Sequence, residues 1–443
     1  MATESPHACF LLFLHGWISE EDIILLTEMK KSKVNIAKLL NYSFFVICLL
    51  AYSVLMLSLF YKQTCSHNGE WFQSDMEAYL LTMLGQESGF DFPYPVYFTV
   101  GKFFLLFTDV EWAGALATML LNSLSPIVLA YYLQKSLQKY YDKLACKEWM
   151  GILTTVITFS VFFISMLFAP EGVYLPGMTH KYLGVFSPNP YHNATYMATR
   201  PFTIVTFFLF VRILDYYEEK TDLKEFAWFG FFLLLSTMTK PSFTLAFVSA
   251  AGLLMAFRII AKKWRNFVPS VKLGLTFIPT FIALLYQFGG VFGGSSQAGP
   301  DGGIGFGWAS AWKVHMENIP FAIILASAFP FFMLVFRLKE LKTNTLYRFS
   351  WFMYLVSLME LLVLFEKGDR FVHMNFSWGY MHGIFFIFIT TLIVLLRDTI
   401  SAIADKRRNG VLLLPFWLAY GWHLICGIIY FLYIWSGQFY YCF

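Results

Sequence analysis

The chain has 443 residues, of which 58% are hydrophobic, 20% are aromatic and only 14% are charged. With a mean hydropathy of +0.59, this composition excludes a soluble domain of that length and indicates a polytopic membrane protein. The net charge of +4 is too small to indicate a nucleic-acid partner. The apolar segments reach about 20 residues without an alternating pattern, so they predict an all-α integral membrane protein rather than a barrel.

Residues 1–40 are predicted to form a cytoplasmic N-terminal tail. The apolar patch from Ala8 to Leu14 is too short to cross a bilayer. Met29 opens a basic stretch with the features of a translation start, so residues 1–28 are expected to be either an over-extended reading frame or a tail without function. Residues 41–443 are predicted to form a single polytopic transmembrane domain.

Apolar length predicts about eleven transmembrane helices. They are expected near residues 42–60, 112–133, 149–169, 201–217, 226–239, 241–258, 273–291, 319–336, 348–365, 379–396 and 411–435. The segment 226–239 is short and meets the next span at Lys240-Pro241 with almost no loop, which predicts a helical hairpin. The segment 94–110 follows a proline-flanked entry and is expected to be re-entrant or interfacial.

The basic residues predict the orientation of the chain. If the N-terminus is cytoplasmic, 24 of the 32 Lys and Arg residues fall in cytoplasmic loops, in agreement with the positive-inside rule. The C-terminus would then be extracytoplasmic. The compact loops and the possible start at Met29 favour the plasma membrane of a prokaryotic cell. The outer loops collect most of the histidines and the remaining cations, so the outer face is expected to carry the function. These loops are 62–111, 170–200, 289–318 and 366–378.

A carboxylate, Asp75, follows the first span and is a functional candidate because it would lie at the boundary between water and lipid. The apolar positions that follow it predict interfacial helices in the first outer loop. Asp75 would lie in the first turn of such a helix, where a role as a mere partner of the helix dipole is the alternative. Ser74 and Glu77 have the spacing of a capping box, and a metal or substrate role is the alternative for Glu77.

Three features together resemble the GT-C superfamily of membrane glycosyltransferases. They are the acidic pair Asp75-Met76-Glu77 after the first span, the Tyr-Pro-rich entry from Phe92 to Phe98, and the break at Lys240-Pro241 between two short spans. Members of that superfamily move a sugar from a polyprenyl-phosphate or polyprenyl-diphosphate carrier to an acceptor on the outer face. The resemblance implies such a donor, and a lipid, glycan or protein as the acceptor.

The resemblance also implies roles for individual residues. Asp75 would be the catalytic residue, either as the general base that accepts the acceptor proton or as the acid that orients the acceptor, because this chemistry needs a carboxylate. Cations would hold the phosphate that leaves, and those available are Lys240, Arg200, Arg370 and His373. No cofactor is certain, although a divalent cation (Mg or Mn) at Glu77 stays open.

The side chains expected to line the substrate site are polar or aromatic and lie in the outer loops. They are Tyr94, Tyr97, Lys181, His192, Asn193, Trp378 and Tyr380. The alternative for the loop 180–201 is a packed lid, and the alternative for Trp378 and Tyr380 is an aromatic belt at the membrane boundary. Asn193-Ala194-Thr195 also has the spacing of a glycosylation acceptor, a pattern that is frequent by chance.

Two other functions share this topology. A flippase or transporter of lipid-linked oligosaccharides would show repeated halves and broken helices in matching places, and only the break at Lys240-Pro241 is visible in the sequence. A polysaccharide polymerase or ligase would carry paired arginines in one long outer loop, whereas the outer arginines here are only Arg200 and Arg370.

Overall fold

The computed structural model describes residues 36–66, 71–167, 182–292, 302–405 and 409–439. Within these residues, eight helices are long and apolar enough to cross a membrane, or nine if one bent pair counts as a single span. The structure therefore supports an all-α, multi-pass membrane protein. The count of about eleven spans is not confirmed. Most of the predicted N-terminal tail lies outside the described residues, and so does Lys181.

The first half of the bundle is built from seven α-helices. They are α3 (Ile36–Thr64), α4 (Met76–Leu84), α5 (Pro95–Phe104), α6 (Val110–Tyr141), α7 (Met150–Val161, after the short 3-10 helix Lys147–Trp149), α8 (Ala194–Leu214) and α9 (Leu223–Thr239).

The second half contains the remaining helices and two short strands. They are α10 (Ser242–Ala261), α11 (Phe267–Leu275), α12 (Ile278–Phe292), β1 (Ile304–Phe306), α13 (Ile319–Phe336), α14 (Glu340–Thr343), α15 (Thr345–Val363), β2 (Leu364–Glu366), α16 (Ser377–Ala404) and α17 (Leu414–Trp435). Further 3-10 helices cover Trp312–Val314, Gly368–His373 (η3) and Gly410–Leu413.

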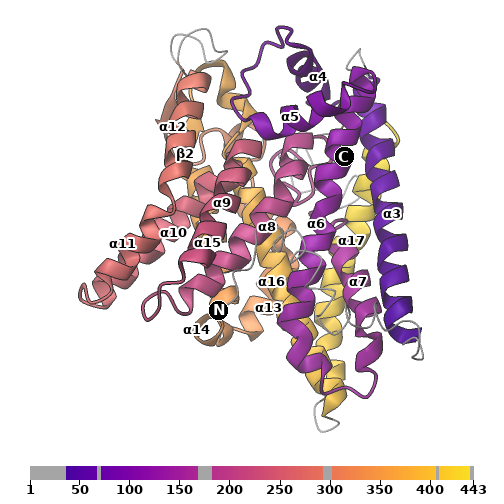
Figure 1. The fold of residues 1–443 in the computed structure, drawn as a ribbon, viewed down its shortest axis with the longest axis vertical. Coiled ribbons are helices and arrows are strands. Elements are labelled where there is room, and N and C mark those ends of the chain that lie inside the picture. Colours follow the sequence, from indigo (N-terminus) through magenta and orange to yellow (C-terminus); the bar gives the residue numbers. More distant parts are fainter. Residues whose placement is uncertain (1–35, 67–70, 168–181, 293–301, 406–408, 440–443) are drawn as a thin grey trace, which may run out of the picture.

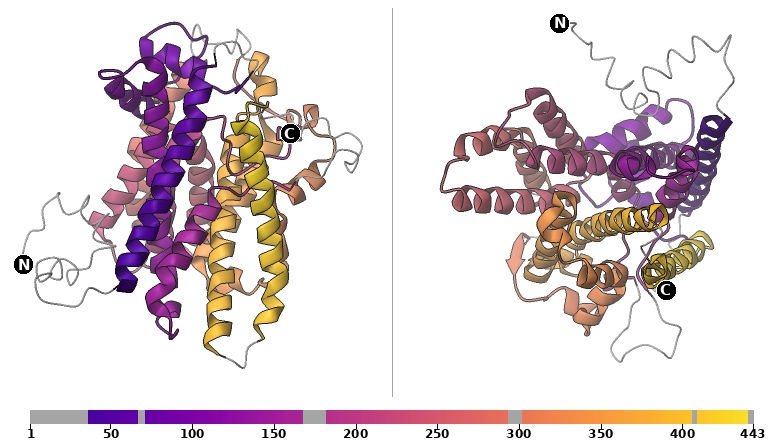
Figure 2. Two further views of the ribbon diagram at one scale, coloured as in Figure 1. Left: turned by 90° about the vertical axis from the view of Figure 1, so that its right-hand side faces the viewer. Right: turned by 90° about the horizontal axis from the view of Figure 1, so that it is seen from below.

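The long helices run along the longest axis of the molecule, and α4 and α5 lie at one end of the bundle (Figures 1 and 2). α16 forms the centre, since its membrane-length window is entirely buried, whereas only 28% of that of α3 is buried at the rim. The exposed apolar side chains of α3, such as Ile47 and Leu50, suit contact with hydrocarbon.

The end of the bundle that carries α4 also carries β1 and β2 (Figure 1). The two strands pair antiparallel, with Gly305 opposite Phe365. They join two of the loops that were predicted to be on the outer side, 289–318 and 366–378, and β2 follows α15 without a break. The pairing therefore fixes η3, which comes directly after β2.

Three predicted spans differ from the structure. α7 ends at Val161, so the span predicted over 149–169 is wrong in its second half. The segment 273–291 falls on α11 and α12, which are bent by 50° at their junction. α9 and α10 form the predicted hairpin. α9 has only 17 residues, however, and is not among the eight helices that are long and apolar enough to cross a membrane.

The non-helical segment that follows α7 packs against α17 and α13. The Ser165 amide donates to the His423 carbonyl at 3.2 Å, and the Leu167 amide donates to the Leu325 carbonyl at 2.8 Å. These bonds satisfy backbone groups that would otherwise be costly within a bilayer. The segment comes so close to α17 that a Cβ atom on Gly427 would clash with the Phe163 carbonyl oxygen.

The start of α8 also differs from the prediction. Arg200-Pro201 was expected to mark the beginning of a span, because proline is common in the first turn of a helix. Instead α8 begins at Ala194 and Pro201 lies inside it. The Asn193 side chain accepts a hydrogen bond from the Tyr196 amide at 2.8 Å, and this cap sets the start of the helix.

Candidate active site

Asp75 occupies the N-cap position of α4, but its side chain does not cap the helix. Its own amide donates to the His192 carbonyl at 3.3 Å, which ties α4 to the segment before α8. The Met76 amide donates to the Ser74 hydroxyl at 3.2 Å. Because α4 begins one residue later than a capping box requires, Glu77 points to solvent, and the box predicted for Ser74 and Glu77 is not formed.

Asn193 connects Asp75 to Lys240. The Asn193 side-chain amide donates to the Asp75 carboxylate. Its side-chain oxygen accepts from the Lys240 ammonium at 3.1 Å, besides capping α8. The Asn193 side chain thus contacts the carboxylate of Asp75 and the ammonium group of Lys240 at the same time.

Lys240 lies in the break between α9 and α10, where the backbone is extended. Its ammonium group also donates to the Thr195 hydroxyl at 3.1 Å and lies 4.7 Å from the centre of the Trp378 ring. Only 8% of Lys240 is exposed, so these neighbours replace most of its water shell. A buried lysine with neutral neighbours is well placed to attract an anion.

The environment shifts the pKa values of both charged groups. Burial raises the pKa of Asp75, and the nearby Lys240 charge opposes this effect. Burial lowers the pKa of Lys240 to about 8, and the Asp75 charge opposes it in turn. His192 is also buried, and burial together with the Lys240 charge lowers its pKa to about 3, so this imidazole is neutral at pH 7.

Two tyrosines complete the surroundings of Asp75. The Tyr79 hydroxyl donates to the Asp75 carboxylate at 3.4 Å and lies 3.0 Å from the Thr195 hydroxyl. Tyr94 is buried, and burial followed by the Asp75 charge raises its pKa. Both phenols therefore remain protonated beside the acid.

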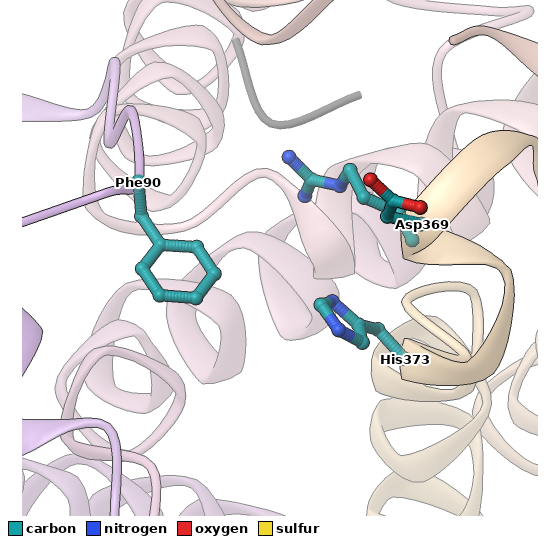
Figure 3. A pocket seen from close by; sticks show the side chains of 4 residues that line it. Phe90, Asp369 and His373 are labelled. Atoms are coloured by element: carbon teal, nitrogen blue, oxygen red, sulfur yellow. The ribbon is translucent and has the colours of Figure 1, made fainter. Parts of the chain in front are cut away.

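A pocket of about 390 Å³ opens next to this cluster and is lined by Phe90, Asp369, Arg370 and His373. Figure 3 shows Phe90 on one wall and Asp369 and His373 on the other. Arg370 and His373 come from η3, where residues three apart lie on one side. His373 and Arg370 interact electrostatically with Asp75 and Lys240, respectively, so the pocket lies close to the cluster.

Arg370 is already engaged within the protein. Its guanidinium forms an ion pair with Glu366 at 2.9 Å. The same carboxylate oxygen of Glu366 accepts from the Asn375 side chain at 2.6 Å, and Asn375 in turn accepts from the Trp378 indole at 3.3 Å. This chain of contacts links the pocket wall to the ring that covers Lys240.

Other predicted site residues lie apart from the cluster. Arg200 is fully buried among the rings of Phe162, Tyr196 and Phe385, and donates to the Pro188 carbonyl. The Tyr97 hydroxyl lies 2.9 Å from that of Thr118, and the Tyr380 hydroxyl lies 3.2 Å from that of Tyr354. These three side chains have neighbours in the core of the bundle.

Sequence reasoning missed several residues of the site. Thr195 contacts both Lys240 and Tyr79. The only sequence pattern that included Thr195 was Asn193-Ala194-Thr195, which was interpreted as a glycosylation acceptor. Phe90 and Asp369 line the pocket, but no local pattern in the sequence marks either of them.

Among the described residues, no group of three or more His, Cys, Asp or Glu side chains is arranged to hold a metal ion. Comparisons of the chain with models of protein families, with curated proteins and with solved structures gave no match. The arrangement of the side chains is therefore the basis for any functional assignment.

Proposed function

We propose that this protein is a membrane glycosyltransferase, which moves a sugar from a polyprenyl-(di)phosphate carrier to an acceptor at the end of the bundle that carries α4 and α5. The observation that carries the proposal is the arrangement of Asp75, Asn193 and Lys240 beside an open polar pocket. An acid and a cation in one site are what the reaction needs, and an apolar bundle provides access for a lipid-linked donor.

In the proposed reaction, an acceptor hydroxyl attacks the anomeric carbon of the donor sugar. Asp75 takes the proton of that hydroxyl as the new C–O bond forms. The bond between the anomeric carbon and the phosphate oxygen breaks, and the phosphate leaves on its carrier lipid with the electron pair. Lys240 stabilises the negative charge of the leaving phosphate.

The surroundings suit these roles. Burial raises the pKa of Asp75, which makes its carboxylate a stronger base than an exposed aspartate. Lys240 has neutral partners in Asn193 and Thr195, whereas Arg370 is paired with Glu366. Lys240 is therefore the stronger candidate to bind the donor phosphate. The role predicted for Arg200 is less favoured because its charge is enclosed by aromatic rings.

The proposal is tested with the purified protein in lipid nanodiscs. A panel of polyprenyl-phosphate and polyprenyl-diphosphate sugars is supplied, and release of the sugar-free carrier lipid is followed by mass spectrometry. Release that depends on Asp75 supports a transferase. If no donor of either class is turned over in the presence of lipid, glycan and protein acceptors, the proposal is wrong.

A flippase for lipid-linked sugars is the second candidate, because the structure contains breaks that the sequence did not reveal. α13 has non-helical backbone angles at Ser327, and its next turn carries Pro330. This kink lies beside the unwound segment after α7, and broken helices that meet are common in transporters. Movement of a fluorescent polyprenyl-linked sugar across a proteoliposome without any change in its covalent structure would favour this candidate.

A further inference from the structure

The pocket beside Asp75 has the composition of a site for a neutral polar molecule. Asp369 and His373 are exposed and Arg370 is partly exposed, so the pocket opens to water. Phe90 is the single apolar residue in its lining and is 42% exposed. A volume of about 390 Å³ lies in the range of pockets that bind small molecules.

The charges at the pocket do not favour an anion. The positive charge of Arg370 is matched by Glu366, with which it forms an ion pair at 2.9 Å, and Asp369 adds a further carboxylate. A phosphate or carboxylate ligand would meet repulsion from Asp369, and the Nε of Arg370 is already engaged with Glu366. An apolar lipid chain would leave the charged groups of the wall without water.

A sugar ring matches both walls. Its CH face can stack on an exposed aromatic ring such as Phe90, and its hydroxyls can donate to Asp369 and exchange hydrogen bonds with His373. The aromatic wall is held in place by ring contacts. Phe90 stacks on Phe92 with ring centres 6.0 Å apart, and Phe92 contacts the ring of Tyr79, whose hydroxyl donates to Asp75.

From these observations we infer that the pocket lined by Phe90, Asp369, Arg370 and His373 binds a neutral saccharide, and that this saccharide is the acceptor of the proposed transfer. The second part rests on the proposed function, whereas saccharide binding stands independently of it. The acceptor would thus be a glycan rather than a protein or a lipid, with the hydroxyl that reacts presented on the side of Asp75.

The test measures binding without any donor, by saturation-transfer NMR on the purified full-length protein in nanodiscs. The probes are glucose, galactose, mannose and N-acetylglucosamine, with glucuronate and inorganic phosphate as anions. The variants are Phe90→Ala and Asp369→Asn. Their matched controls are Phe107→Ala, an aromatic residue that is 72% exposed and not in the lining, and Asp215→Asn, an exposed acid at the other end of α8.

We expect at least one neutral sugar to bind and both anions to bind more weakly. Phe90→Ala should weaken binding about 2- to 10-fold through loss of ring stacking, and Asp369→Asn about 10- to 100-fold through loss of a charged hydrogen bond. The two controls should bind as the wild type does. Absence of sugar binding, stronger binding of an anion, or binding as tight as that of the wild type in both pocket variants would overturn the inference.

A transfer assay separates this inference from the proposed function. With donor present, Phe90→Ala should raise the KM for a saccharide acceptor while the KM for the donor stays unchanged. Transfer to a protein or lipid acceptor that is unaffected by Phe90→Ala would overturn the assignment of the acceptor and leave the transferase intact. Sugar binding without turnover of any donor would leave the site intact and overturn the transferase.

Discussion

Asp75 and Lys240 lie on opposite sides of a single amide, that of Asn193, which donates to the carboxylate and accepts from the ammonium at 3.1 Å. Among the described ion pairs, none joins the two charges directly. Each charge therefore keeps free hydrogen-bonding positions, Asp75 for a proton and Lys240 for an anion. Asn193 thus holds both groups without pairing them with each other.

Replacing Asp75 by Asn should abolish transfer. The substitution keeps the size of the side chain but removes the base, so we expect a loss of about 10²- to 10⁴-fold in kcat. Glu77→Gln is the matched control, because Glu77 is an exposed acid two residues after Asp75 in the sequence. Release of carrier lipid measures both variants, and near-normal turnover by Asp75→Asn would rule out Asp75 as the base.

Replacing Asn193 by Ser separates capping from the connection between Asp75 and Lys240. Serine caps a helix about as well as asparagine, so the melting temperature should change little, whereas kcat should fall because serine cannot reach both charged groups. Asn344→Ser is the control, since Asn344 caps α15 in the same way, accepting from the Tyr347 amide at 3.2 Å. Equal activity of the two variants would show that Asn193 serves only as a cap.

Replacing Lys240 by Met should raise the KM for the donor about 10- to 100-fold, the worth of a hydrogen bond to a charged group. The KM for the acceptor should stay close to that of the wild type. Lys313→Met, at an exposed lysine, is the control for loss of a positive charge. An unchanged KM for the donor in Lys240→Met would remove Lys240 from the phosphate site.

The pH dependence of kcat/KM for the donor should have an alkaline limb near pH 8. Lys240 has a pKa of about 8, so it is protonated and attracts the phosphate below that pH, and it loses its charge as the pH rises through 8. The acid limb should lie above the ordinary pKa of aspartate because burial raises the pKa of Asp75. Lys240→Arg should move the alkaline limb upward, since arginine stays charged. If the alkaline limb of Lys240→Arg stays near pH 8, the limb reflects the titration of another group.

Replacing Gly427 by Ala should destabilise the bundle. The added Cβ would clash with the Phe163 carbonyl oxygen, so α17 or the segment after α7 must shift, at a cost of about 1–3 kcal/mol. Gly421→Ala in the same helix is the control, because nothing lies within 4 Å of its added Cβ. Thermal unfolding in detergent measures both. Equal melting temperatures would contradict the close approach.

The sequence by itself determined the class of the protein, and four of the side chains that it marked as site candidates lie together in the structure. Apolar length is a local property of the chain, and every predicted span overlaps a helix, although the helix at 149–169 ends at Val161 and the segment 273–291 falls on two helices. Asp75 and Lys240 were predicted because charged residues next to apolar helices are costly without a purpose. Asn193 and Trp378 were predicted as polar or aromatic residues of the outer loops. The structure then places these four side chains together.

Only the tertiary structure decided which polar groups meet. Arg200 and Lys240 were equivalent in the sequence as outer cations, yet the start of α8 at Ala194 places Arg200 within the helix, where aromatic rings enclose it. Phe90 and Asp369 face each other across a pocket although 279 positions separate them. Contacts of this kind depend on how α4, α8, α9 and α16 pack against one another, and no periodicity within a single helix records that packing.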